Sequence, residues 1–225
     1  MNQTDFAKFT PKLLEDLLLK GSPAVFSLFK RYFDDAEKRQ VIWNSIEAFI
    51  QRDDLKIASL CFAANFHSVT GKQEDALKYV DQLTSIQPDQ NDHLLLKAKI
   101  LKRSDKSTDA VQVLAPAIES FLNDKFSASK VAKYQLRFGS IAKGQEIISS
   151  FIQKPTFQEK IGDLHEMQAI WYLIEMADRL MKEGKYLDAA CFYRRIEMIF
   201  EEFIDDQLDF HGYSIRRMSF VDYIK

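Results

Sequence analysis

The fold is decided by LCFAANFHSVTGKQEDALKYVDQLTSIQP, the stretch from residue 60 to residue 88. Ala64 and Ala76 are small residues that let two antiparallel helices approach each other closely. Gly71 supplies the turn between the two helices, and Pro88 stops the second one. The stretch therefore predicts a pair of helices packed side by side.

The same pattern recurs along the chain with a period of about 34 residues. Residues of similar character return without gaps at equivalent positions, in the sets Leu60, Leu94 and Ala128; Ala64, Ala98 and Ala132; Ala76, Ala110 and Gly144; and Val80, Leu114 and Ile148. The turn glycine Gly71 returns two periods later as Gly139. This period predicts three tandem helix pairs at 57–90, 91–124 and 125–158. A helix pair of this length resembles the tetratricopeptide repeat.

The whole chain is predicted to be all-α, a tetratricopeptide-like solenoid whose helix pairs stack into a right-handed superhelix. Residues 1–56 are expected to form N-terminal amphipathic helices that pack on the solenoid. Residues 57–158 hold the three repeats, 159–204 a fourth repeat after an insertion of about eleven residues, and 205–225 a loop and a C-terminal helix. Repeat arrays need polar caps at their ends. The apolar C-terminal SFVDYIK therefore leads us to expect a fragment of a longer array.

Composition narrows the class of protein. The chain has 225 residues, 46% of them hydrophobic, with only 7 glycines and 5 prolines, which favours long helices over sheets with many tight turns. A formal net charge of −2 does not indicate a nucleic-acid-binding arm, and we expect no direct sequence-specific nucleic acid partner. The sequence contains no signal peptide and no membrane-spanning stretch. Two widely separated cysteines suit a reducing compartment, so we expect a cytoplasmic protein without a membrane partner.

Motifs that carry catalysis or bind metals are missing from the sequence. It contains no glycine-rich phosphate loop, no GxSxG elbow and no HExxH. His165 and Glu166 lack the second histidine of a zinc motif, and Asp205, Asp206 and Asp209 lack the glycine and glutamate of a calcium loop. We therefore predict no catalytic residue, no metal site and no enzymatic activity.

A cluster of positive charge coincides with the repeat. Lys99 and Lys133 are one period apart, and so are Arg103 and Arg137. Within each first helix the two residues are four positions apart and share one face. First helices packed about 10 Å apart would place the four side chains in a basic square, with Lys130 one turn away. Two interpretations stay open: a site for a polyphosphate or an acidic partner, and a solvated basic face.

Several segments resemble the family of auxiliary subunits of the N-terminal acetyltransferase A complex, also known as the NMDA receptor-regulated protein 1 family. The resemblance is densest from residue 163 onward, in LHEMQAIWY (164–172), the repeat around Gly184 and DDQLDFHGYSIRRMSFVDYI (205–224). It extends upstream through LLLKGSPAVFSLFKRYF (17–33), LLKAKILKRS (95–104) and SKVAKYQL (129–136).

The resemblance implies a non-catalytic scaffold that wraps the catalytic acetyltransferase subunit and, in the full-length protein, helps anchor it to the ribosome. It also implies an inositol hexakisphosphate held as a structural ligand in a basic pocket, and no cofactor that the chain requires. Carried over by position, the residues of this pocket are Lys97, Lys99, Lys130, Lys133 and Tyr134. Arg103 and Arg137 of the basic square complete the predicted anion-binding site.

A second interpretation is a stand-alone tetratricopeptide adaptor that binds peptides. Such modules hold a C-terminal carboxylate with polar residues spread over three first helices. Asn65 and Lys130 are suitable for that role, but Cys61 and Leu96 occupy places where polar residues are expected. The acetyltransferase scaffold is therefore the leading hypothesis.

Overall fold

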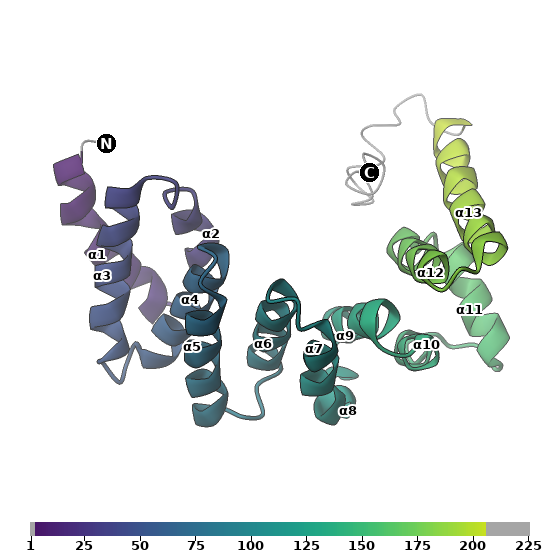
Figure 1. The fold of residues 1–225 in the computed structure, drawn as a ribbon, viewed down its shortest axis with the longest axis horizontal. Helices are drawn as coiled ribbons and strands as arrows, with labels where there is room; N and C mark the ends of the chain where they lie inside the picture. Colours follow the sequence, from purple (N-terminus) through teal and green to yellow (C-terminus); the bar gives the residue numbers. More distant parts are fainter. Residues whose placement is uncertain (1–2, 206–225) are drawn as a thin grey trace. The chain divides into compact units, whose positions relative to one another are not determined.

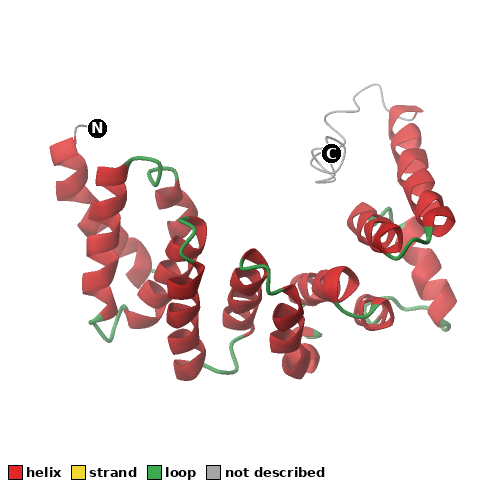
Figure 2. Ribbon diagram, in the orientation of Figure 1, coloured by secondary structure: helices red, strands yellow, loops and turns green. Residues whose placement is uncertain are grey.

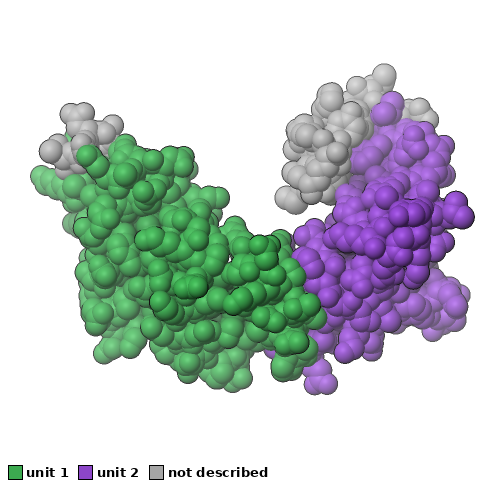
Figure 3. Space-filling model, in the orientation of Figure 1, with its two compact units in different colours: residues 1–116 green, residues 117–225 purple. Residues whose placement is uncertain are grey.

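The protein is all-α. The computed structural model describes residues 3–205, and within them every regular element is helical (Figures 1 and 2). None of the described helices has the length and apolar content that a membrane crossing requires. Residues 206–225, which carry the predicted loop, the C-terminal helix and most of the 205–224 run, lie outside the described residues. The chain divides into two compact units, residues 1–116 and 117–225 (Figure 3).

Unit 1 is a row of helices that pack mainly on their sequence neighbours. Its helices are α1 (Gln3–Leu19), α2 (Val25–Lys30), α3 (Ala36–Ile50), α4 (Lys56–Val69), α5 (Gln73–Ile86), α6 (Asn91–Arg103) and α7 (Ser107–Leu114). Helices α4 and α5 form one pair and α6 and α7 the next, while α1 and α3 pack beside α4. The first helix of one pair also contacts the first helix of the following pair, α4 against α6.

Unit 2 repeats this arrangement. Its helices are α8 (Ile118–Phe121), α9 (Lys125–Phe138), α10 (Ile141–Ser149), α11 (Phe157–Glu166), α12 (Ile170–Lys182) and α13 (Tyr186–Asp205). The pairs are α9 with α10 and α12 with α13, and the first helices α9 and α12 contact each other. Helix α11 lies between the two pairs in sequence. The boundary between the units, at residues 116 and 117, falls inside the stretch 91–124 that the period marks as one repeat.

Helix starts follow the period that the small residues show. Second helices begin at Gln73, Ser107 and Ile141, at 34-residue intervals. In the fourth pair both helices begin 45 residues after their counterparts in the third, at Ile170 and Tyr186. The small side chains lie where paired helices meet, and the alanines among them are fully buried: Ala64, Ala76, Ala98, Ala110, Ala128, Ala132, Ala177 and Ala189. An all-α helical-repeat fold is therefore confirmed.

The turns within the pairs differ in one place from the sequence expectation. Gly71 has a φ of 85° and Gly184 a φ of 74°, in the left-handed region that glycine adopts without steric cost. Gly139, one of the predicted turn glycines, instead has a φ of −116°. The turn is different there because Gly139 ends α9 and Ser140 directly caps α10, its hydroxyl accepting a hydrogen bond from the Lys143 amide at 3.4 Å.

The core of unit 1 contains an aromatic cluster around a buried histidine. The His67 ring stacks on Tyr79 with centroids 5.3 Å apart and meets Trp43 edge-on at 4.4 Å. Neither ring nitrogen of His67 has a hydrogen-bond partner among the described residues. Burial lowers the pKa of His67, which keeps the ring neutral inside this apolar cluster.

Candidate anion-binding site

The seven residues predicted to bind an anion lie on two helices. Helix α6 of unit 1 carries three of them and helix α9 of unit 2 carries four. Each helix is the first of its pair, as the period requires. The two groups belong to different units.

Helix α6 brings Lys99 and Arg103 to the face that meets α4. The Lys99 ammonium group is 3.5 Å from the Asn65 side-chain oxygen, and these residues are 34 positions apart. Arg103 donates a hydrogen bond from Nη1 to the Ser68 hydroxyl at 2.8 Å. Equivalent positions of successive first helices thus face each other within unit 1.

Positive charge is crowded around Lys99. Burial, followed by the nearby charges of Arg103 and Lys30, lowers the pKa of Lys99. An anion placed beside this ammonium group would relieve the repulsion between like charges. The α6 half of the predicted site therefore has an electrostatic reason to bind an anion.

Lys97 does not join this group. Its ammonium group forms an ion pair with Asp81 of α5, with Nζ and Oδ1 2.8 Å apart. Residues two positions apart on a helix point to different faces, so Lys97 lies toward the second helix of the preceding pair while Lys99 lies toward α4. Of the three predicted residues on α6, the structure groups Lys99 with Arg103 and separates Lys97 from both.

On helix α9, lysine side chains lie over aromatic rings. The Lys133 ammonium group is 4.9 Å from the centre of the Trp171 ring on α12, and that of Lys130 is 5.0 Å from the Phe126 ring. Tyr134 lies beside Phe138, with centroids 6.3 Å apart. A cation–π contact positions an ammonium group and leaves its charge in place. The ring contacts thus fix where the ammonium groups of Lys130 and Lys133 lie.

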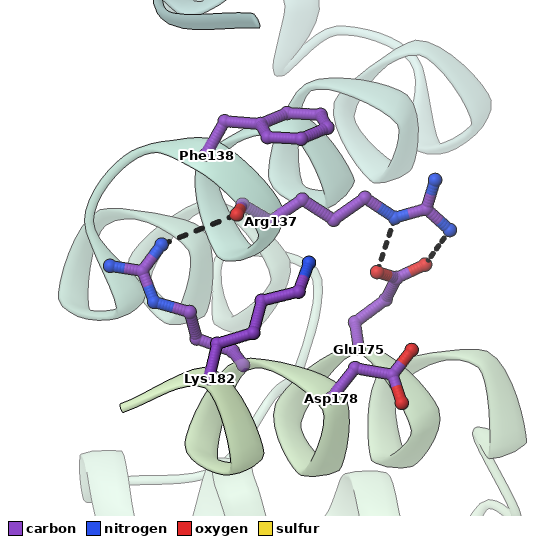
Figure 4. Close-up of a pocket in the computed structure, with 6 residues that line it drawn as sticks. Arg137, Phe138, Glu175, Asp178 and Lys182 are labelled. Atoms are coloured by element: carbon purple, nitrogen blue, oxygen red, sulfur yellow. Dashed lines mark hydrogen bonds and ion pairs between the residues drawn. The ribbon is translucent and has the colours of Figure 1, made fainter. Parts of the chain in front are cut away.

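Arg137, the seventh predicted residue, is occupied by a carboxylate. Its Nε and Nη2 donate two parallel hydrogen bonds to the oxygens of Glu175 on α12, which is only 3% exposed (Figure 4). The paired carboxylate raises the pKa of Arg137. Sequence reasoning missed Glu175, although an acidic residue within the apolar run WYLIEMA is a signal for a buried ion pair.

A pocket of about 190 Å³ opens beside this ion pair in unit 2 (Figure 4). Arg179 donates from Nη1 to the Arg137 carbonyl oxygen at 3.3 Å and from Nε to Glu183 at 2.7 Å. Asp178 accepts a hydrogen bond from the Tyr193 hydroxyl of α13 at 2.8 Å. The residues that line the pocket are Arg137, Phe138, Glu175, Asp178, Arg179 and Lys182.

Helix α13 is exposed along most of its length. From Tyr186 to Ile204 only Ala189, Ile199 and Phe203 are buried. Leu187 is 84% exposed, and four further large apolar side chains of this helix are exposed as well: Tyr186, Tyr193, Met198 and Ile204. These side chains are candidates for contact with a partner, and the exposed ion pairs of Arg194 with Glu197 and Glu201 lie among them on the same helix.

Comparison with known proteins gives one consistent family. The model of the N-terminal acetyltransferase A auxiliary subunit family matches residues 1–225. A mouse relative, N-alpha-acetyltransferase 16, NatA auxiliary subunit, is 28% identical over 97% of this chain and 27% of its own length. The Arabidopsis thaliana relative, N-terminal acetyltransferase A complex auxiliary subunit NAA15, is 23% identical over 100% of this chain and 27% of its own length.

The fold also matches a chain in a solved structure of Naa15/Naa10 bound to HypK-THB. The TM-score is 0.85 and the identity 26%, over 100% of this chain and 35% of that chain. The chain thus spans about a quarter of the length of the curated relatives it matches.

Proposed function

Because the chain belongs to the family of N-terminal acetyltransferase A auxiliary subunits, we propose that it is a non-catalytic scaffold segment that binds the catalytic acetyltransferase subunit. The observation that carries this proposal is the structural match over the whole chain to a solved structure of Naa15/Naa10 bound to HypK-THB. The relatives are named auxiliary subunits, which favours a scaffold over an enzyme. The same match favours this role over the stand-alone peptide-binding adaptor.

The exposed apolar side chains of α13 are our candidate contact for the catalytic subunit. Burying side chains such as Leu187 against a partner would remove their apolar area from water, at roughly 25 cal/mol per Å². The carboxylates and cations of α12 next to this surface would then form the polar edge that protein interfaces have around an apolar centre.

The first prediction tests this contact. The purified chain should bind the catalytic subunit of the same complex, and Leu187→Asp should weaken the binding at least about tenfold, because a buried unpaired carboxylate is costly. Isothermal titration calorimetry measures both affinities. Phe9→Asp is the matched control, since Phe9 on α1 is 55% exposed and lies in unit 1. Loss of affinity in both variants, or no binding by the unmodified chain, would count against the proposal.

The ribosome is the second partner in this proposal, through the full-length protein. The support is the family resemblance, which implies a scaffold that holds the catalytic subunit near the ribosome. Co-sedimentation of the full-length protein with ribosomes tests it. Recovery of the protein only in the ribosome-free fraction would contradict this part of the proposal.

We further propose that the chain binds inositol hexakisphosphate, with Lys99 in unit 1 and Lys130 and Lys133 in unit 2 as candidate contacts, each taken within its own unit. Support comes from the crowded positive charge at Lys99 and from the cation–π contacts that position Lys130 and Lys133. Lys97 contributes less, because Asp81 already pairs with it.

The second prediction concerns this ligand. Inositol hexakisphosphate at 100 times its dissociation constant should stabilise the folded chain by about 2.7 kcal/mol and raise the melting temperature. Lys99→Glu combined with Lys133→Glu should abolish the rise. The double variant Lys20→Glu with Lys143→Glu changes the net charge by the same amount. It should still show the rise in melting temperature. If both double variants lost this rise to the same extent, the stabilisation by inositol hexakisphosphate would not depend on Lys99 and Lys133.

A further inference from the structure

One buried histidine takes part in the contact between three helices of unit 1. His67 lies near the end of α4 and is 6% exposed. Its ring stacks on Tyr79 of α5, with centroids 5.3 Å apart and an angle of 6° between the planes, and meets Trp43 of α3 edge-on at 4.4 Å. Trp43 also stacks on Phe66 of α4 at 5.2 Å. The imidazole ring therefore belongs to the contact that joins α3 to the helix pair α4–α5 (Figure 1).

The surroundings of His67 suit a neutral ring. Among the described residues neither Nδ1 nor Nε2 has a hydrogen-bond partner, and the neighbouring rings are Trp43, Phe66 and Tyr79. A neutral imidazole leaves one donor and one acceptor unpaired there, whereas an imidazolium leaves two donors and a full charge. A buried charge without a partner costs far more free energy than a buried neutral polar group. The packed cluster therefore disfavours the protonated ring.

Charged groups near the cluster do not reverse this preference. Burial has the largest influence and lowers the pKa of His67. Asp75 of α5 favours the protonated ring to a smaller extent, and Lys72 in the turn between α4 and α5 opposes it. From α3, Glu47 acts on the phenol of Tyr79. The packed ring therefore takes up a proton only at a lower pH than a hydrated histidine does.

We propose that His67 makes the contact between α3 and the pair α4–α5 sensitive to acid, because a charged ring fits only the opened, hydrated state of the aromatic cluster. In the opened state the ring titrates near the ordinary histidine pKa of 6.5, and in the closed state its pKa is lower. A proton thus stabilises the opened state. The full strength of the contact is present above about pH 6.5 and is lost progressively as the pH falls below it.

The expected change is a shift in population. Helix α3 also buries Ile42 and Ile46 completely, so the closed state stays dominant at neutral pH, and acid raises the share of molecules in which α3 has opened. The pair α4–α5 has its own close packing at Ala64 and Ala76, both fully buried. Opening of α3 thus leaves this pair folded, and the response is confined to the helices before α4.

Hydrogen exchange of the α3 amides in the full chain tests this proposal. Protection factors, corrected for the intrinsic pH dependence of exchange, should fall between about pH 7.5 and about pH 5. The part of this fall that is due to His67 can reach about thirtyfold, the excess of charged over neutral ring at about pH 5 for a pKa of 6.5. His67→Phe and His67→Gln cannot take up the proton, so each should show a fall smaller by that factor. The comparison needs only one of these two variants to fold.

His93→Gln is the matched control. His93 is a second histidine of unit 1, on α6, and its Nδ1 is also buried without a hydrogen-bond partner in the part of the chain that the structure describes. It lies outside the aromatic cluster around His67, so this variant should keep the full acid response of α3.

NMR of the histidine Cε1–Hε1 groups gives a second, direct measurement. The His67 signal, identified by its loss in either His67 variant, should titrate with a midpoint below the ordinary pKa of 6.5. A midpoint above this value would show that attraction between an imidazolium and the ring faces dominates, and it would overturn the proposal. Equal loss of α3 protection in the unmodified chain and in the His67 variants, or loss of the acid response in His93→Gln, would overturn it as well.

Discussion

Replacing Arg137 with methionine is expected to destabilise the folded chain by about 1–3 kcal/mol. Glu175 is 3% exposed, and its two oxygens accept hydrogen bonds from Arg137. Removing the guanidinium group leaves a largely buried carboxylate without its counter-charge. Urea unfolding followed by circular dichroism measures the change in the free energy of unfolding.

Two further variants make this prediction specific to the ion pair. Arg137→Met combined with Glu175→Met should recover most of the loss, because apolar residues of similar volume can replace a buried pair at little cost. Arg194→Met should leave the stability unchanged, since Arg194 pairs with Glu197 and Glu201 on the surface of α13. A single Arg137→Met variant as stable as the unmodified chain would contradict the burial of Glu175.

Replacing Gly144 with alanine is expected to destabilise the chain by about 1–3 kcal/mol, although the same exchange usually stabilises a helix interior by roughly 1 kcal/mol. A Cβ atom at Gly144 would lie 2.7 Å from both Cγ and Cδ2 of Leu136. Leu136 is fully buried on α9, so it has little room to move away. Thermal and urea unfolding of the variant measure the cost.

Gly162 provides the matched control for this exchange. It also lies within a helix, α11, but a Cβ atom there would have no neighbour within 4 Å. Gly162→Ala should therefore keep or raise the stability, by up to about 1 kcal/mol. If both alanine variants were stabilised, α9 and α10 would be less closely packed than the structure shows.

The helix pairs could be predicted from sequence because their cause is local. Ala64, Ala98 and Ala132 recur at one spacing, because at each of these positions the second helix of the pair packs closely against the first. The period of the small residues therefore reports directly where paired helices touch. The same stacking brings Lys99 beside Asn65, the residue one period earlier in unit 1.

The charge partners could not be predicted in this way. Lys97 of α6 pairs with Asp81 of α5. The 34-residue period does not tell how these two helices are rotated relative to each other, so it could not predict this pair. Arg137 pairs with Glu175, which lies beyond an insertion that breaks the 34-residue spacing. An ion pair depends on the position of a few terminal atoms, and these are set by packing of the whole repeat. The sequence therefore indicated where positive charge gathers but not which charges are already neutralised.

The two tryptophans are divided between the units, which has a practical consequence. Trp43 lies in the aromatic cluster of unit 1, and Trp171 lies beneath the Lys133 ammonium group in unit 2. Intrinsic fluorescence therefore contains one reporter for each half of the molecule. A chain that keeps a single indole allows the melting of that half to be recorded by itself, and comparing the two records shows whether the halves unfold in one cooperative step.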